Sequence, residues 1–263
     1  MRIQCDIAWI DLGPGLGLHQ THGGSGTLMA ALLAFDTSGE RVHVGVSVHG
    51  DVFVGEDAGG SQASANLIPC VRQVLGQAGI GLRELDAIAF GRGPGAFTGL
   101  RAACSAAQGL AWGAALSVLP IDTLMAVAED ARLRKGADDV WVAMDARMGE
   151  IFAGRYRWSG AGWLTLVGPA LVTPDGLNAL CLSDPSNWLV GSAPSAFGDR
   201  LRRESTAGID SDARPAASAL LACAWAAWAR SEAIDAVAAL PLYLRDKVAL
   251  TTAERRASAA NIA

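Results

Sequence analysis

The segment that most constrains this chain is a glycine-rich stretch, residues 91–101, with the sequence GRGPGAFTGLR. It follows a short apolar run, residues 86–90, that is typical of a buried strand. It precedes an alanine-rich segment up to residue 112, whose apolar side chains recur with the period of a helix. The sequence therefore predicts a strand, a turn and a helix. In open α/β sheets such a turn lies at the edge where ligands and partners are met, because helix N-termini present backbone N–H groups there.

Local physical chemistry admits two interpretations of the glycines in this turn. In the first, they let the backbone approach a phosphate or a partner loop closely, and Thr98 caps the helix. In the second, a sharp reversal from strand to helix simply needs residues that tolerate a positive φ angle. The stretch fits neither G-x-x-x-x-G-K-[ST] nor G-x-G-x-x-G, which favours the second interpretation. We define the signature turn as Gly91, Arg92, Gly93, Pro94, Gly95, Phe97, Thr98 and Gly99.

Composition and charge indicate a soluble globular protein that does not hold nucleic acid by itself. Of 263 residues, 51% are hydrophobic and 18% charged, which is ample for a core, and the net charge is −5. Affinity for nucleic acid depends mainly on Lys and Arg that neutralise phosphates. The five cysteines are scattered without a C-x-x-C pair, so we expect reduced thiols and a cytoplasmic protein. The sequence predicts neither a membrane span nor a signal peptide.

The first half of the chain, residues 29–125, predicts a three-stranded meander, a helix over 64–78, the strand, turn and helix around the signature turn, and a further strand. A helix capped by Asp122 or Thr123 follows. His43 alternates with the valines of the second strand, so we expect it on the opposite, solvated face. Before this half, residues 1–28 form a glycine-rich stretch typical of a flexible leader.

The second half, residues 126–250, repeats the order of the first. The Ala-Phe-Asp-Thr segment that ends at Thr37 matches Ala-Met-Asp-Ala after residue 142, and GRGPGAF at Gly91 matches GSAPSAF at Gly191 without a gap. We infer two duplicated α/β subdomains that face each other across a cleft. The last residues, 251–263, are small and polar and predict a disordered tail.

Four short sequence motifs together indicate a family resemblance: GRGPGAFTGLR at residues 91–101, LAFDTS at 33–38, VAMDARMGE at 142–150 and PLYLR at 241–245. The chain resembles the TsaB (YeaZ) family. The resemblance implies an actin, Hsp70 and sugar-kinase-like architecture, with two duplicated subdomains of mixed sheets and helices across a degenerate cleft.

The same resemblance implies a function without chemistry of its own. The chain would be the dimerisation and scaffold subunit for synthesis of N6-threonylcarbamoyladenosine at position 37 of tRNA. Its expected partners are a homologous catalytic subunit (TsaD-like) and a small P-loop ATPase (TsaE-like), with tRNA contacted only indirectly and a homodimer possible when the chain is alone.

The cleft supplies the candidates for a vestigial nucleotide site. After the first strand, the carboxylate of Asp36 and the hydroxyls of Thr37 and Ser38 could bind hydrated Mg²⁺ or a phosphate. The matching turn of the second half is less suited to this, because Ala146 has no hydroxyl and Met148 is too large to let a phosphate approach the backbone. The competing interpretation, which we favour, is that each aspartate caps the turn after its strand through the backbone two residues on. The candidates are Asp36, Thr37, Ser38, Asp145 and Gly191.

No cofactor is expected in the isolated chain, with ATP and Mg²⁺ entering only through partner subunits. The alternative is an ATP-dependent kinase or hydrolase in which Asp36 and Asp145 bind the metal. All four histidines lie within the first 49 residues. The catalytic relatives of the family carry an H-x-x-x-H metal pair in a helix where residues 61–68 of this chain have no histidine. We therefore predict no catalytic residue and no metal site.

The resemblance places the partner interface on the two helices of the first half, residues 64–78 and 98–112. Alanine and glycine surround the second of these helices, so another helix could approach its backbone closely. We expect Arg92 and Arg101 to make polar contacts at the turn, and Arg101 to meet a carboxylate because a first-turn arginine opposes the helix dipole. The predicted interface residues are Leu67, Ile68, Val71, Leu75, Thr98, Leu100, Arg101, Ala102, Gln108 and Gly109.

Overall fold

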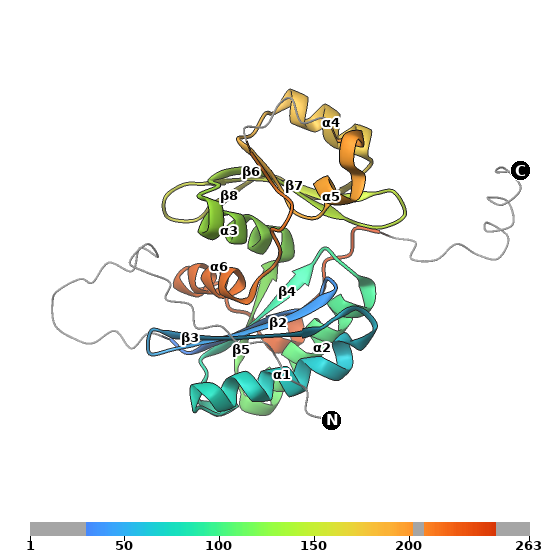
Figure 1. Ribbon diagram of the computed structural model, residues 1–263. Coiled ribbons are helices and arrows are strands. Elements are labelled where there is room, and N and C mark those ends of the chain that lie inside the picture. Colours follow the sequence, from blue (N-terminus) through green and yellow to red (C-terminus); the bar gives the residue numbers. More distant parts are fainter. Residues whose placement is uncertain (1–29, 202–207, 246–263) are drawn as a thin grey trace, which may run out of the picture.

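The computed structural model describes residues 30–201 and 208–245 (Figure 1). The expected leader, residues 1–28, and the expected tail, residues 251–263, lie outside the described residues.

The first sheet has the strand order β3-β2-β1-β4-β5. Its antiparallel meander consists of β1 (Leu32–Asp36), β2 (Arg41–Val48) and β3 (Asp51–Ala58). Two strands parallel to β1 complete it, β4 (Ala87–Gly93) and β5 (Ser117–Asp122). Apolar side chains from both faces of β1 and β4 are buried, because helices cover both sides of the sheet.

The second sheet repeats this connectivity, with the order β8-β7-β6-β9-β10. Its meander consists of β6 (Asp139–Asp145), β7 (Ile151–Trp158) and β8 (Trp163–Val172), followed by the short parallel strands β9 (Trp188–Val190) and β10 (Gly208–Asp210). Strand for strand, the two halves have the same topology. The predicted duplication and the α/β fold class are confirmed.

In the described ranges, six helices complete the layers that Figure 1 shows. The outer face of the first sheet carries α1 (Ala63–Ala78) and α2 (Phe97–Ala114), and α4 (Pro174–Ser183) and α5 (Ala193–Phe197) lie beyond the second sheet. Between the sheets lie α3 (Thr123–Lys135) and α6 (Ala217–Ala229), packed against each other. Four 3₁₀ turns occupy Gly60–Gln62, Leu82–Glu84, Gly198–Arg200 and Ala236–Ala238.

The last helix of each half packs against the sheet of the other half. Helix α3 follows the first sheet, yet Leu124 and Val127 pack with Val140 of the second sheet. Helix α6 follows the second sheet, yet Leu220 packs with Leu32 of the first. The expected boundary between residues 125 and 126 thus falls inside α3.

Two local expectations are corrected. Helix α2 begins at Phe97 with Ala96 as its N-cap, and Thr98 lies exposed in the first turn without capping. His43 is not solvated: it is 3% exposed, because α6 covers the face of β2 opposite the valines. Helix α3 does begin at Thr123 with Asp122 as N-cap, but without a side-chain capping bond.

Candidate functional site

The signature turn packs directly onto the turn after β1. A Cβ atom on Gly91 would overlap the Asp36 carboxylate, and one on Gly99 would overlap the carbonyl oxygen of Thr37. A Cβ on Gly95 would likewise overlap Ser38. Among the four glycines of the signature turn, only Gly93 has a positive φ, 115°. Three of the four glycines therefore serve the close approach of the chain's own turn, which is a contact that neither interpretation of the sequence contained.

Hydrogen bonds hold the two turns together. The Thr37 hydroxyl donates to the carbonyl of Gly99 at 2.7 Å, and the backbone N–H of Ala96 donates to the carbonyl of Ser38 at 2.8 Å. Thr37 is fully buried. These residues fix the N-terminus of α2 against the edge of the first sheet.

Both carboxylate oxygens of Asp36 accept hydrogen bonds from the chain itself. One oxygen accepts from the backbone N–H and hydroxyl of Ser38 at 2.7 and 2.6 Å, and the other accepts from the hydroxyl of Thr123 at 2.8 Å. The predicted capping of the turn is confirmed, and Asp36 is fully buried. Replacing Asp36 with alanine would leave these donors unpaired in any protein with this fold, so a loss of function on that change would not identify an enzyme.

Asp145, the counterpart in the second half, is more open. Its carboxylate accepts from the backbone N–H of Arg147 at 2.8 Å and pairs with the Arg147 guanidinium at 3.2 Å, so its predicted capping is also confirmed. The Ser192 hydroxyl accepts from the backbone N–H of Asp145 at 3.0 Å. Gly191 has φ 109°, and a Cβ there would lie 2.9 Å from the Met144 sulfur.

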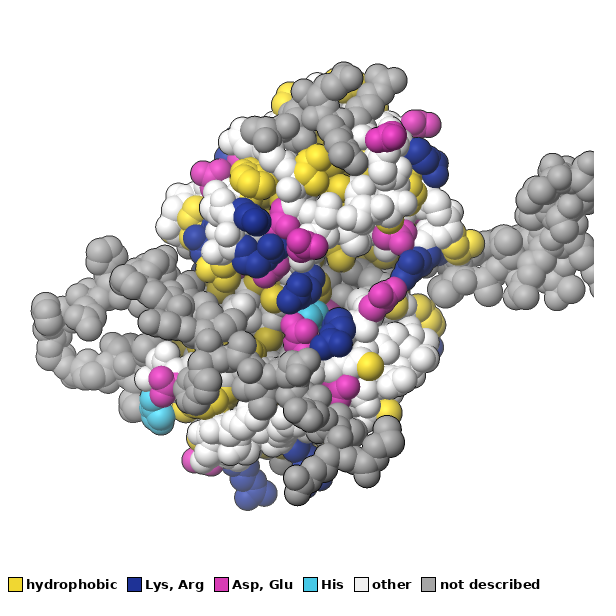
Figure 2. All heavy atoms as spheres, viewed as in Figure 1, with side chains coloured by type: hydrophobic (Ala, Val, Ile, Leu, Met, Phe, Trp, Pro, Cys, Tyr) yellow, Lys and Arg dark blue, Asp and Glu magenta, His cyan; other side chains and the backbone are white. Residues whose placement is uncertain are grey.

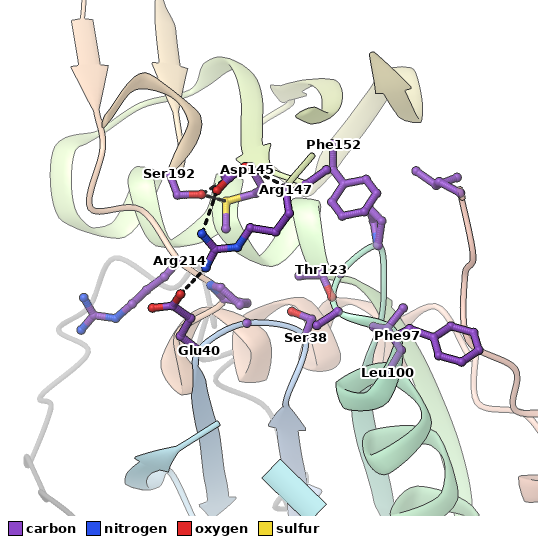
Figure 3. Close-up of a pocket in the computed structure, with 18 of the residues that line it drawn as sticks. Ser38, Glu40, Phe97, Leu100, Thr123, Asp145, Arg147, Phe152, Ser192 and Arg214 are labelled. Carbon is purple, nitrogen blue, oxygen red and sulfur yellow. Dashed lines mark hydrogen bonds and ion pairs between the residues drawn. The ribbon is translucent and has the colours of Figure 1, made fainter. Parts of the chain in front are cut away.

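A cavity of about 820 Å³ opens between the halves. Figure 2 shows basic and acidic side chains gathered around the hollow, and Figure 3 shows its lining. Ser38 and Phe97 come from the first half, and Asp145 and Phe152 from the second. Arg147 reaches across the opening and pairs with Glu40.

Beside this opening lies a charged cluster that local sequence patterns did not reveal. The buried His43 places its Nδ1 atom 3.1 Å from a carboxylate oxygen of Glu56, and Arg41 and Arg214 lie 3.3 and 3.7 Å from the same carboxylate group. The close contact with His43, aided by the positive charges of Arg214 and Arg41, lowers the pKa of Glu56 from 4.5 to about 2. The hairpin register, which pairs His43 with Glu56, was the one available signal.

The predicted interface residues separate into two groups. Leu67, Val71 and Leu75 of α1 and Leu100 of α2 are buried in their own half, because the apolar stripe of each helix faces the first sheet. The remaining six are at least partly accessible: Ile68, Thr98, Arg101 and Gly109 are exposed, and Ala102 and Gln108 are half-buried.

Both turn arginines make polar contacts within the chain. Arg92 pairs with the carboxylate of Asp122 at 2.5 Å. Arg101 lies 3.9 Å above the ring of Phe97 and donates to the hydroxyl of Tyr243 at 3.2 Å. A carboxylate was expected for Arg101, but within the described part of the chain an aromatic ring and a phenol take that place.

No three His, Cys, Asp or Glu side chains in residues 30–201 and 208–245 are grouped so that they could hold a metal ion. Among the helices described here, none combines the length and the apolar composition that crossing a bilayer requires.

Comparison with known proteins connects this architecture to one family. The family model described as "TsaD: tRNA N6-adenosine threonylcarbamoyltransferase" matches residues 58–187. The "tRNA threonylcarbamoyladenosine biosynthesis protein TsaB" of Escherichia coli K12 is 32% identical over 83% of this chain and 96% of its own length. The protein of the same name from Haemophilus influenzae is 33% identical over 82% of this chain and 94% of its own length.

Comparison with solved structures indicates the same family as the sequence comparison. YeaZ from Pseudomonas aeruginosa is 35% identical, with a TM-score of 0.74, and an uncharacterized Pseudomonas aeruginosa protein with similarity to peptidase YeaZ is 35% identical, with a TM-score of 0.76. Each comparison covers 82% of this chain and 100% of the solved chain. With its duplicated actin-like halves, the chain belongs to the TsaB (YeaZ) family.

Proposed function

We propose that this protein is a cytoplasmic, non-catalytic dimerisation and scaffold subunit for synthesis of N6-threonylcarbamoyladenosine on tRNA. It binds and activates a homologous catalytic subunit of the TsaD type, and a small P-loop ATPase of the TsaE type joins them. Its relatives are named for this biosynthesis. The match of residues 58–187, which span parts of both halves, to the TsaD model supports a partner of related sequence. Related surfaces can pair about a pseudo-twofold axis, as identical subunits pair about a true one.

The observation that carries the proposal is the open face of α1 and α2. The two helices form the outer layer on the first sheet (Figure 1). Ile68 is 38% exposed on α1, beside a surface groove of about 440 Å³ that Arg72 also lines. On α2 the exposed positions recur at helical spacing and are mostly small: Thr98, Arg101, Ser105, Gly109, Trp112 and Gly113.

Small residues on this face suit a helix-to-helix interface. A Cβ added at Gly109 or Gly113 would meet nothing within 4 Å, so the backbone of α2 is open to close approach. Trp112 is 78% exposed at the end of the same face, and aromatic side chains are common anchors of interfaces. Ile68, Arg101 and Gly109 are therefore the residues we assign to partner contact.

The hydrogen bonding of Asp36 supports a role without chemistry. A buried carboxylate that accepts three bonds from its own chain is poorly placed to hold a magnesium ion for a kinase or hydrolase. ATP and Mg²⁺ then act on the partner subunits.

The test is the solution mass, by light scattering after gel filtration, of the chain alone and mixed with the catalytic homologue from the same cell. We expect a heterodimer that forms at the expense of monomer or homodimer. Ile68→Asp places a charge in the interface and should weaken association at least about tenfold, since a buried unpaired charge is costly. Leu164→Asp is the control, because Leu164 is exposed on β8, away from this face.

Two outcomes would contradict the proposal. In the first, the two proteins stay separate with and without ATP. In the second, Ile68→Asp and Leu164→Asp weaken association equally, which would move the interface away from α1 and α2.

A further inference from the structure

The cavity between the halves has the size and lining of a small-molecule site. Its volume of about 820 Å³ lies within the range of ligand pockets, roughly 300–1,000 Å³. Both halves contribute apolar walls, and Figure 3 shows Phe152 from the second half on one side of the space and Leu100 from the first on the other. The apolar lining residues include Phe97, Leu100, Met144, Met148, Phe152, Leu242 and Leu244.

The cavity is rich in arginine, and each of these arginines is paired with a carboxylate of the chain. Four arginines line it, against two carboxylates, Glu40 and Asp145. Two further carboxylates, Glu56 and Glu150, pair with three of the four arginines. The four are Arg41, Arg147, Arg214 and Arg245. A pocket with apolar walls and an arginine rim favours an anionic group on an apolar body.

Arg147 is the arginine best placed to receive the anion. It lies at the opening between Asp145 and Glu40, as Figure 3 shows. The pair with Glu40 is weak and exchangeable, because the two side chains are 69% and 81% exposed. A carboxylate or phosphate can take the place of Glu40 and accept two parallel hydrogen bonds from the guanidinium.

The backbone holds Arg147 in this place. Arg147 and Met148 have φ angles of 62° and 56°, left-handed values that are uncommon for residues other than glycine. The turn is closed by hydrogen bonds from Ala146 N–H to the Glu150 carbonyl and from Glu150 N–H to the Arg147 carbonyl. Backbone conformations of this kind cluster at ligand sites, where the surrounding structure maintains them.

We propose that the cleft binds a small organic anion, a carboxylate or phosphate on an aromatic body, and that Arg147 binds its anionic group by exchanging Glu40 for it. The aromatic body lies against Phe152 and the other apolar side chains of the wall. Recognition needs no divalent cation, because arginine supplies the positive charge and Asp36 is occupied within the chain. Phe97 and Leu100 at the start of α2 line this cleft, whereas Ile68 and Gly109 of the partner face do not. Binding is measured on the chain alone, so its result is separate from that of partner association.

The experiment is isothermal titration calorimetry of the whole chain with phenyl phosphate, in buffer that contains EDTA. Inorganic phosphate lacks the apolar body and phenol lacks the anion, so each should bind at least about tenfold more weakly than phenyl phosphate. Arg147→Gln should weaken phenyl phosphate at least about tenfold, whereas Glu40→Gln should strengthen it about two- to fivefold by freeing Arg147.

Arg230→Gln is the matched control. Arg230 is also a half-exposed arginine in a surface ion pair, with Glu232, and it does not line the cavity. The circular dichroism of each variant verifies folding. The proposal is overturned if phenyl phosphate does not bind up to about 10 mM, if it binds only with Mg²⁺, or if Arg147→Gln and Arg230→Gln bind it equally.

Discussion

Gly99 tests the explanation of the signature turn, because it contacts the turn after β1 so closely that no side chain fits. In Gly99→Ala the new methyl group overlaps the carbonyl oxygen of Thr37, which is backbone and cannot rotate away. The start of α2 must then move away from Thr37 and Ser38. That movement breaks the two hydrogen bonds of 2.7 and 2.8 Å that join the turns.

The magnitude follows from these contacts. The two hydrogen bonds contribute about 0.5–1.5 kcal/mol each, and forcing a methyl group into a packed site costs about 1–3 kcal/mol. Alanine returns at most about 1 kcal/mol through its better helix propensity. We expect Gly99→Ala to lower the free energy of unfolding by about 2–4 kcal/mol, which corresponds to a melting temperature lower by about 5–15 °C for a chain of this size.

Gly109→Ala in the same helix is the control, because its Cβ would meet nothing within 4 Å. There only helix propensity changes, so we expect the melting temperature to rise by about 2–4 °C. Thermal unfolding followed by circular dichroism measures both variants. If Gly99→Ala were as stable as Gly109→Ala, close approach would not be the reason for glycine in this turn.

Two further predictions concern charged side chains that pair within the fold. Arg155 is fully buried and pairs with Asp139, and it donates to the carbonyl of Pro185 at 3.0 Å, so Arg155→Met should cost about 3–5 kcal/mol in thermal unfolding. Arg157→Met, which removes an exposed arginine 3.6 Å from the same aspartate, should cost less than about 1 kcal/mol, and equal losses would refute the assignment. Glu56 has a pKa lowered from 4.5 to about 2, so its ionised form stabilises the fold above pH 4.5 and this contribution is lost as the pH falls toward 2. In Glu56→Gln, melting temperatures measured over that range should converge on those of the unmodified chain, and a constant difference would contradict the prediction.

The elements of this fold could be predicted from sequence because their signals are local. Alternating valines marked β2, and the helical period placed the start of α1 within one residue of Ala63. The matching motifs at Gly91 and Gly191 helped to predict that the two halves are duplicated. Each of these inferences needed only a short window of sequence.

The parts that could not be predicted depend on segments far apart in the chain. Three glycines of the signature turn are required because Asp36, Thr37 and Ser38, more than 50 residues earlier, pack against them. The sequence of the turn alone therefore does not reveal why glycine is needed there. His43 is buried by α6, a helix from the other end of the chain. Helical period showed that Leu67, Val71 and Leu75 share a stripe, but it does not say whether that stripe meets the chain's own sheet or a partner.

The exchange of α3 and α6 between the halves has a consequence for biosynthesis on the ribosome. The inner face of the first sheet is covered mainly by α6, which begins at Ala217, and to a smaller extent by α3. Roughly 100 residues separate it from the end of β5, and their synthesis takes about 5–20 s at about 5–20 residues per second. Throughout that interval Leu32, Ala34 and Leu119 of the nascent chain lack their native cover. The first half is thus completed only after the strands of the second half have been made, and until then the emerging first half is a natural client for chaperones.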